Sequence, residues 1–196
     1  FADKYRIPVV STMMGIGVMR TEDPMYFGMV GNNGKAYANR AMNESDLLIM
    51  VGARVADRAI SQPDLIMTDK VLIHIDVDPA EIGKNVGPSI PLVGDARHIF
   101  EDIMKEDFSC EHEAWISTLE GYRETMVQKR NPDPAYVDPA VFITMLSNEM
   151  KDDAVYVADV GQNQIWSCNY HIVKNGRFLT SGGMGTMGYS IPAAMG

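Results

Sequence analysis

Three apolar runs in the first half of the chain each stop at residues that could contact a ligand. The runs are followed by Gly52-Ala53-Arg54, Asp76-Val77-Asp78 and Gly94-Asp95. These ends supply a cation, several carboxylates and glycines that let a ligand approach the backbone. The runs are rich in Val, Ile and Leu without alternation, which is typical of strands buried on both faces of a parallel sheet. Because ligands of such sheets bind beyond the carboxyl ends of the strands, we predict a binding edge for a nucleotide-sized ligand, with ordinary strand-end loops as the alternative.

Two glycine-rich stretches could also lay backbone groups open to a ligand. Gly31-Asn-Asn-Gly34 precedes a predicted helix, and a helix start beside glycines points free N–H groups at an anion. A plain strand-to-helix turn explains this stretch equally well. Gly183-Met-Gly185-Thr-Met-Gly188 matches the GxGxxG pattern of dinucleotide-binding turns and follows a predicted strand. That pattern is weak by itself, and Gly15-Ile-Gly17 is weaker because no third glycine follows.

Strands and helices must alternate to position these residues. We predict strands at residues 7–12, 47–51, 71–75, 91–95, 154–158 and 177–180. We predict helices at residues 35–43, 79–83, 96–105, 111–130 and 139–150, with Asp95 as the N-cap of the third. Residues 21–34 are interpreted as a turn-rich connection, and residues 165–170 are assigned no element. The alternation predicts an α/β fold with a Rossmann-like parallel sheet flanked by helices.

A proline-rich stretch divides the chain. Three prolines within residues 132–139 stop the preceding helix and keep the backbone extended. We therefore predict a first domain at residues 1–130, a linker at 131–138, and the start of a second α/β domain at 139–196. The sequence begins at Phe1 without an initiator Met and stops at Gly196, where a helix is barely begun. It is expected to be a piece of a longer protein.

The composition argues against several classes of protein. A net charge of -9 and a pI near 4.8 do not suit a nucleic-acid surface. No apolar run approaches the ~20 residues of a membrane span. Cys110 and Cys168 lie far apart without CxxC spacing, which favours a reducing, cytoplasmic compartment and no zinc site. The histidines are scattered, so no metal site is predicted, and His74 is expected to be a core residue with satisfied hydrogen bonds.

Four separated motifs carry a resemblance to a known family. They are Ser181–Gly196 (SGGMGTMGYSIPAAMG), Asp159–Trp166 (DVGQNQIW), Ser45–Arg54 (SDLLIMVGAR) and His74–Asn85 (HIDVDPAEIGKN). In their order along the chain they resemble the acetolactate synthase large subunit family of thiamine-diphosphate enzymes. The resemblance covers essentially the whole chain. It implies that residues 1 to about 130 form the family's central, FAD-binding domain and that the rest opens its diphosphate-binding domain.

The resemblance implies two sets of cofactor-binding residues. Gly161, Gln162 and Asn163 would lie at thiamine diphosphate, while Gly185 and Met187 would offer backbone carbonyls to its aminopyrimidine. That pairing would hold the cofactor so that its own amino group can take the thiazolium proton. The residues that would line FAD are Thr12, Met13, Gly31, Asn32, Asn33, Gly34, Arg54, Arg58, Asp76, Val77, Asp95 and Ala96. The catalytic glutamate would lie in an upstream domain and the Mg²⁺ ligands beyond Gly196, so this piece alone is expected to be inactive.

The chain departs from the family pattern at three places. Asn32-Asn33 stands where the family usually has Met-His, Val55-Ala56-Asp57 where it has Phe-Asp-Asp, and Asn163 where it has His. Losing the carboxylate at Ala56 and the imidazole at Asn33 removes two flavin contacts, so altered cofactor use is the alternative to FAD binding. Asn163 can still donate a hydrogen bond to a phosphate but cannot carry a proton charge.

The activity that the resemblance implies is the condensation of two 2-keto acids in branched-chain amino-acid synthesis. Pyruvate would be decarboxylated and the resulting carbanion added to a second keto acid, with thiamine diphosphate, Mg²⁺ and a structural FAD as cofactors. The alternatives are another thiamine-diphosphate carboligase or decarboxylase, such as a glyoxylate carboligase or an FAD-independent acetolactate-forming enzyme. An NAD-dependent dehydrogenase or a non-catalytic nucleotide-binding module is a further alternative. The parent is expected to be a homodimer or tetramer, with a regulatory small subunit left open.

Overall fold

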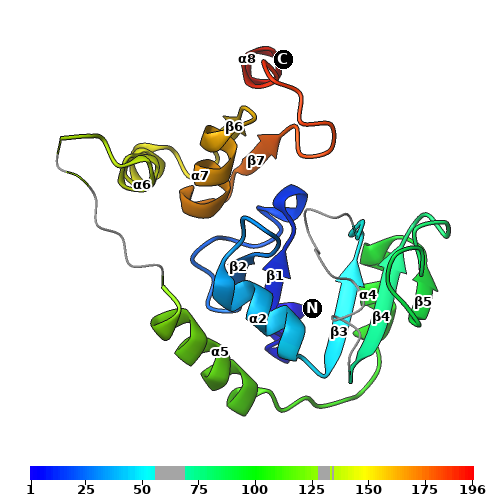
Figure 1. Ribbon diagram of the computed structural model, residues 1–196. Helices are drawn as coiled ribbons and strands as arrows, with labels where there is room; N and C mark the ends of the chain where they lie inside the picture. The colour runs from blue at the N-terminus through cyan, green and yellow to red at the C-terminus, as the bar shows by residue number, and fades with distance from the viewer. Residues whose placement is uncertain (56–68, 128–132, 134) are drawn as a thin grey trace.

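The strands of the protein pair in parallel and form three groups (Figure 1). The computed structural model describes residues 1–55, 69–127, 133 and 135–196. The strands are β1 (Val9–Ser11) with β2 (Tyr26–Met29), then β3 (Leu47–Val51), β4 (Val71–Asp76) and β5 (Ile90–Val93) in that order, and β6 (Val155–Ala158) with β7 (Arg177–Thr180). This arrangement confirms the predicted α/β fold with parallel strands.

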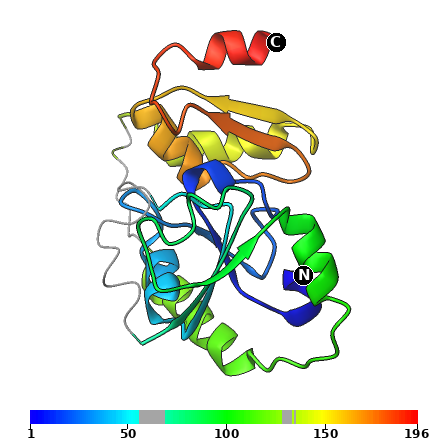
Figure 2. The same cartoon turned by 90° about the vertical axis from the view of Figure 1, so that its right-hand side faces the viewer.

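Helices separate most of the strands along the chain. They are α1 (Ala2–Tyr5), the 3-10 helix η1 (Met13–Gly15), α2 (Ala36–Glu44), α4 (Ala96–Ile103), α5 (Glu113–Thr125), α6 (Pro139–Glu149), α7 (Gln162–Tyr170) and α8 (Ser190–Met195). Figure 2 shows α2 on one side of strands β1 to β4, and α1 with α4 on the other. In the part of the chain that the structure describes, no helix combines the length and the apolar character needed to cross a membrane.

The ends of β3, β4 and β5 lie at one edge of their sheet. Val51 is in register with Ile75, and Ile75 with Leu92. The ladders continue one residue further, because Gly52 N donates to Ile75 O at 2.8 Å and Gly94 N donates to Asp76 O at 2.9 Å. The prediction that the three apolar runs end side by side is therefore confirmed.

Two apolar clusters hold the described residues between 1 and 125 together. Ala38 of α2 and Leu72 of β4 are essentially inaccessible and belong to one cluster, against which Val10 of β1 packs. Phe27 of β2 and Leu119 of α5 belong to the other. The amphipathic stripe predicted on residues 111–130 thus packs on α2 and β2 through Trp115, Leu119 and Tyr122.

A third cluster joins the two halves of the chain. Met29 of β2 packs with Ala158, Cys168, Val173 and Phe178, all of which belong to residues 139–196. Burying a side chain of this size contributes roughly 1.5–3 kcal/mol. Residues 139–196 therefore contact the first unit, by which we mean the described residues between 1 and 125, through apolar side chains as well as being covalently linked to it. The domain boundary at residues 131–138 stays a prediction.

Several local predictions were wrong. Residues 26–29 form β2 rather than a turn, with Gly28 at φ +89° inside the strand. Residues 165–170 belong to α7, whose buried positions are the polar or small residues Gln164, Ser167 and Cys168. Residues 79–83 make hydrogen-bonded turns and no helix, since Glu81 N donates to Asp78 O. The helix predicted at 111–130 is shorter, because it begins at residue 113 and ends at 125, and residues 128–130 lie outside the described residues.

His74 also differs from its predicted role. It is buried in the middle of β4 with 1% of its surface exposed, as expected of a core residue. Neither ring nitrogen has a hydrogen-bond partner among the described residues. The described residues therefore do not satisfy His74, which differs from the prediction. A strand pattern can show that a side chain is buried, but it does not show what faces that side chain.

Candidate functional site

The five residues predicted at thiamine diphosphate lie in two segments that meet at Asp159. Gly161, Gln162 and Asn163 form the beginning of α7, directly after β6. Gly185 and Met187 lie in the loop between β7 and α8. The Asp159 carboxylate joins these segments, because it accepts hydrogen bonds from Gly188 N at 3.0 Å and Ser190 Oγ at 2.8 Å. Residues separated by more than 20 positions are thus brought to one end of the β6–β7 pair.

The beginning of α7 offers free backbone to a ligand. Gly161 has φ +107°, and a Cβ added there would meet no atom within 4 Å. The first N–H groups of a helix have no partner within it and attract anions. The side chain of Asn163 turns back along the helix, since its Nδ2 donates to Asp159 O at 3.3 Å. The geometry therefore favours backbone contacts to an anion at this end of α7.

The other end of α7 contacts the first unit. Asn169 Nδ2 donates to Asn33 O at 2.8 Å. The Lys35 ammonium lies 4.2 Å from the centre of the Tyr170 ring, a cation–π contact. In the first turn of the helix, Gln164 Nε2 donates to Thr180 Oγ1 at 2.7 Å, which fixes α7 against the end of β7. One helix therefore connects the two groups of predicted cofactor residues.

The loop Gly31–Gly34 follows β2 and is held by the Asn39 side chain and by a hydrogen bond within its own backbone. Gly31 exchanges two hydrogen bonds with the Asn39 side chain, at 2.8 and 2.9 Å, and Gly34 N donates to Gly31 O. A Cβ at Gly34 would lie 2.4 Å from Met29 O, so only glycine fits. Thr12 and Met13, also predicted at FAD, follow the neighbouring strand β1, with Thr12 as the N-cap of η1.

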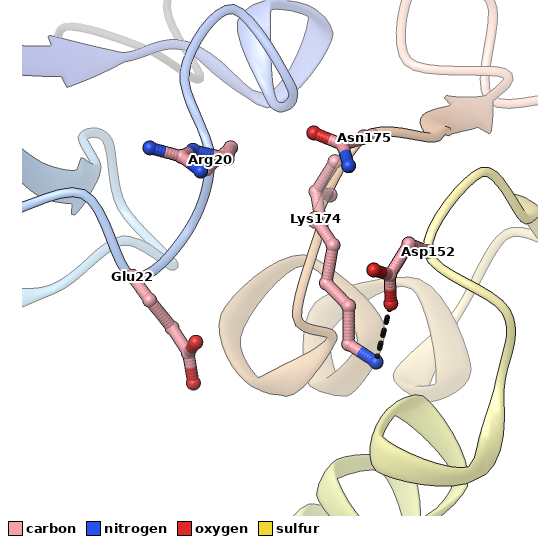
Figure 3. Close-up of a pocket in the computed structure, with 6 residues that line it drawn as sticks. Arg20, Glu22, Asp152, Lys174 and Asn175 are labelled. Carbon is pink, nitrogen blue, oxygen red and sulfur yellow. Dashed lines mark ion pairs between the residues drawn. The ribbon is translucent and has the colours of Figure 1, made fainter.

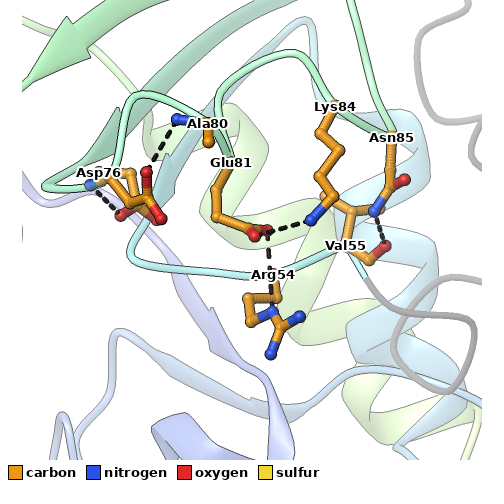
Figure 4. Close-up of polar contacts among 8 residues, drawn as sticks. Arg54, Val55, Asp76, Ala80, Glu81, Lys84 and Asn85 are labelled. Carbon is orange, nitrogen blue, oxygen red and sulfur yellow. Dashed lines mark hydrogen bonds and ion pairs between the residues drawn. The ribbon is translucent and has the colours of Figure 1, made fainter.

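Except for Arg58, the remaining residues predicted at FAD lie at the edge formed by β3, β4 and β5, part of which is drawn in Figure 4. The Arg54 side chain is 77% exposed, and its Nε lies 3.7 Å from the Glu81 carboxylate, which also binds Lys84 Nζ at 2.8 Å. Asp76 Oδ1 accepts from Asp78 N at 2.9 Å, just before the hydrogen-bonded turns at residues 79–83, which contain Glu81. A largely exposed guanidinium beside open backbone suits a pyrophosphate.

Three further predicted positions lie at this edge. Asp95 is the N-cap of α4 and accepts from Arg97 N at 2.8 Å, as predicted, and Ala96 is the first residue of that helix. Val77 follows β4 and is largely exposed. The structure thus brings together the predicted positions at β3, β4 and β5. Arg58 lies outside the described residues, as do Ala56 and Asp57.

A polar hollow that the sequence did not predict lies between the two halves of the chain (Figure 3). It has a volume of ≈ 350 Å³ and is lined by Arg20, Glu22, Asp152, Val173, Lys174 and Asn175. Lys174 Nζ pairs with Asp152 at 3.1 Å. The lining carries cations and carboxylates in equal number and none of the predicted site residues. Among the described residues, no cluster of three or more His, Cys, Asp or Glu side chains could hold a metal ion.

Two buried groups at the carboxyl end of α7, His171 and Cys168, are neutral near pH 7. Burial lowers the pKa of His171 to about 4, and its Nδ1 lies 2.7 Å from Ser147 Oγ. Burial raises the pKa of the Cys168 thiol to about 12. Ser147 Oγ donates to Ile143 O at 2.8 Å. The Ser147 hydroxyl can therefore accept from His171, and both side chains are satisfied when Nδ1 of His171 carries the proton. These side chains are structural.

Comparison with known proteins assigns both halves of the chain. Residues 1–103 match the family model "Thiamine pyrophosphate enzyme, central domain", which is more than half of the chain. Residues 159–196 match "Thiamine pyrophosphate enzyme, C-terminal TPP binding domain". The chain belongs to the thiamine pyrophosphate enzyme family. Thiamine pyrophosphate, or thiamine diphosphate, is the cofactor of this family, and the GxGxxG pattern lies inside the segment that matches its binding domain.

The chain is also similar to curated thiamine pyrophosphate enzymes. It is 37% identical to the "Acetolactate synthase large subunit" of Lactococcus lactis subsp. lactis over 100% of this chain and 34% of that protein. It is 36% identical to the "Probable acetolactate synthase large subunit" of Methanocaldococcus jannaschii, over 100% of this chain and 35% of that protein. It is 37% identical to the "Acetolactate synthase large subunit" of Corynebacterium glutamicum, over 100% of this chain and 32% of that protein. The chain spans about a third of the length of these relatives.

The residues present fit thiamine diphosphate. Its diphosphate needs backbone donors, which the open start of α7 offers, and its ring needs a close approach to a backbone, which the loop around Gly185 and Gly188 permits at φ +64° and +80°. The sequence prediction did not include Asp159, although the residue lies inside the motif Asp159–Trp166. The available signal for Asp159 was a carboxylate that directly follows a predicted strand and precedes Gly161 by two residues.

Proposed function

We propose that the complete protein containing this chain is an acetolactate-forming enzyme that condenses two 2-keto acids with release of CO₂. The meeting of the start of α7 and the loop 181–188 at Asp159 carries the cofactor part of this proposal. The choice of reaction is supported by relatives named acetolactate synthase large subunit that match over the whole chain. Thiamine diphosphate supplies the electron sink for the decarboxylation when it is bound.

The bonds of the proposed reaction balance without an oxidant. In the first keto acid the bond between the carboxylate and the carbonyl carbon breaks, and CO₂ leaves. The electron pair left behind forms the new carbon–carbon bond to the carbonyl carbon of the second keto acid, whose oxygen takes up a proton. This chain would hold the diphosphate at the start of α7. It would also offer the backbone carbonyls of Gly185 and Met187 to the aminopyrimidine ring of the cofactor.

We propose FAD as a second, structural cofactor at the edge formed by β3, β4 and β5. The exposed Arg54 guanidinium suits a pyrophosphate, and Gly52, whose added Cβ would meet no atom within 4 Å, leaves the backbone open. The rival function is a flavin-independent acetolactate-forming enzyme. It is favoured by Asn33, whose carbonyl is bound to Asn169 and which stands where the resemblance expects a histidine. We further propose Mg²⁺ as the partner of the diphosphate, and a homodimer or tetramer in the cytoplasm.

An acetolactate assay on the complete protein tests the proposal. Pyruvate, Mg²⁺ and thiamine diphosphate are supplied with and without FAD, after any bound flavin has been stripped. Product that depends on FAD supports both parts of the proposal, and product without FAD supports the flavin-independent rival. Bound thiamine diphosphate without product would reject pyruvate as the substrate.

A matched pair of variants tests the flavin edge. Arg54→Ala is expected to raise the dissociation constant for FAD by about tenfold, since charge-assisted hydrogen bonds are worth roughly 1.5–3 kcal/mol. Arg177→Ala removes an exposed arginine at the beginning of β7 and is expected to leave FAD binding unchanged. Equal FAD binding by both variants would reject the assignment of Arg54.

Light scattering on the active protein tests the proposed homodimer or tetramer, and a fully active monomer would contradict it.

A further inference from the structure

Beyond Gly182, which lies against the Met14 side chain, the loop between β7 and α8 has little apolar support. Met184 and Met187 are 90% and 83% exposed. Cβ atoms added at Gly183 and Gly188 would meet nothing within 4 Å. Inside the loop, Gly185 N donates to Ser181 O and Thr186 N donates to Ser181 Oγ, at 3.1 and 3.0 Å, but these bonds fix only its local shape. Its position relative to α7 must come from contacts outside the loop.

Asp159 supplies those contacts. Its Oδ1 accepts from Val160 N at 2.8 Å and from Gly188 N at 3.0 Å. Its Oδ2 accepts from Ser190 N at 3.0 Å and from Ser190 Oγ at 2.8 Å. One carboxylate therefore binds both its own segment and the far side of the loop. The two bonds to Ser190 also fix the beginning of α8.

The position of Asp159 in the fold is itself well defined. It directly follows Ala158, which is fully buried at the end of β6 and in register with Thr180 of β7. Its main-chain oxygen accepts from Asn163 Nδ2 in the first turn of α7. The backbone of Asp159 is thus part of the segment that leads into α7. Its side chain reaches Gly188 of the loop and Ser190 at the start of α8, which lie 29 and 31 residues further along the chain.

We propose that Asp159 is a positioning residue that holds the loop 181–190 against the beginning of α7. It thereby sets the backbone of Gly185 and Met187 opposite Gly161, Gln162 and Asn163. This inference rests on the proposed function, because these five residues are its thiamine diphosphate contacts. Asp159 itself binds protein groups and is assigned no contact with the cofactor.

The hydrogen bonds argue against a role for Asp159 as a general acid or a metal ligand. An ionised carboxylate has about four lone-pair directions, and four donors already point at this one. The same donors stabilise the charged form and hold the pKa of Asp159 at about 2, chiefly through Ser190. The group therefore stays ionised throughout the neutral range and acts as a fixed acceptor.

The test compares Asp159→Asn with Asp153→Asn in the complete protein. The first variant keeps the side-chain shape but replaces one acceptor oxygen by a donor that faces N–H groups. We expect faster hydrogen exchange in peptides covering 181–190 and a dissociation constant for thiamine diphosphate raised by about tenfold to a hundredfold. Asp153 is an exposed aspartate just before β6, and its variant is expected to match the unmodified protein in both measurements.

A split between binding and turnover separates positioning from chemistry. If Asp159 positions the loop, saturating thiamine diphosphate is expected to restore most of kcat in Asp159→Asn. A kcat that stays low at saturation overturns the positioning role. Ser190→Ala removes only the hydroxyl bond, so we expect a smaller rise in the dissociation constant. It also provides a second variant if Asp159→Asn does not fold.

The failure of this inference can be told apart from failure of the proposed function. Unchanged exchange of residues 181–190 in cofactor-free Asp159→Asn overturns the anchoring, whatever the protein catalyses. Faster exchange with unchanged affinity overturns the link between the loop and the cofactor. No thiamine diphosphate binding by the unmodified protein rejects the proposed function, while the exchange measurement still tests the anchoring.

Discussion

Asn169 Nδ2 donates a hydrogen bond to the main-chain oxygen of Asn33 at 2.8 Å and so ties the end of α7 to the loop Gly31–Gly34. The beginning of the same helix carries the residues assigned to thiamine diphosphate, and the loop carries residues assigned to FAD. A helix of nine residues therefore connects the residues assigned to thiamine diphosphate with one of the segments assigned to FAD. Because the loop is itself held by Asn39, the bond from Asn169 connects two well-supported pieces of backbone.

Asn169→Ala is expected to weaken the attachment of residues 139–196 to the first unit. The variant loses the bond to Asn33 and a second bond to Ile165 O, and each such bond contributes roughly 0.5–1.5 kcal/mol. The measurement is urea unfolding followed by tryptophan fluorescence, since Trp166 lies in α7 and stacks on Tyr170.

The matched control for this prediction is Asn148→Ala. Asn148 is an exposed asparagine near the end of α6, so its variant is expected to keep the wild-type midpoint. A shared midpoint for the Asn169 and Asn148 variants would contradict the role assigned to Asn169.

His171 is expected to make the stability of the protein depend on pH between about 6.5 and 4. Its pKa is about 4 in the folded chain and ~6.5 in an unfolded one, so in this window the unfolded state binds a proton that the folded state does not. The free energy of unfolding therefore falls as the pH falls from about 6.5 to 4. His171→Asn keeps a donor near Ser147 but does not titrate, and it is expected to reduce the difference between the urea midpoints at pH 7 and pH 5.

A histidine variant on the surface provides the comparison. His98 is exposed on α4, and His98→Asn is expected to keep the wild-type difference between pH 7 and pH 5. Since His171 also stacks on Tyr156 at 4.1 Å, its variant is expected to be less stable at both pH values. The informative quantity is the difference between the two midpoints. A difference equal to that of the unmodified protein would show that folding does not lower the pKa of His171.

The edge formed by β3, β4 and β5 could be predicted because its residues follow local rules. Leu47–Val51 and Val71–Ile75 are continuous apolar runs, and a parallel sheet must put their ends together. Asp95 could likewise be recognised as an N-cap from its place before an apolar pattern. In each case the signal and the structure lie within a few residues of each other.

Other features escaped prediction because their partners are distant or polar. The buried face of α7 is made of Gln164, Ser167 and Cys168, so the count of apolar residues does not reveal a helix. Asp159 binds backbone groups 29 and 31 residues away, and no side-chain pattern marks a backbone donor. Burial of His74 could be predicted, but its lack of partners among the described residues depends on packing between elements.

Gly34→Ala and Gly121→Ala are expected to change stability in opposite directions. A Cβ at Gly34 would lie 2.4 Å from Met29 O and 2.6 Å from Val30 C, which are backbone atoms that cannot move aside. The cost is expected to reach about 1–3 kcal/mol. Gly121 lies inside α5 with nothing within 4 Å of an added Cβ, so alanine there should stabilise the helix by about 0.5–1 kcal/mol. Thermal unfolding of both variants checks the signs, and a stabilising Gly34→Ala would contradict the tight loop.

The two cysteines are expected to react at very different rates in the native protein. Cys110 is exposed, whereas Cys168 is 8% exposed and burial raises its pKa to about 12. Because the thiolate is the reactive form, a thiol reagent at pH 8 should modify Cys110 quickly and Cys168 only after unfolding in denaturant. Cys110→Ser should therefore abolish the fast native signal and keep the signal in denaturant. Rapid labelling of native Cys110→Ser would show that the cluster of Met29, Cys168 and Phe178 is open to solvent, against the buried junction between the two halves of the chain.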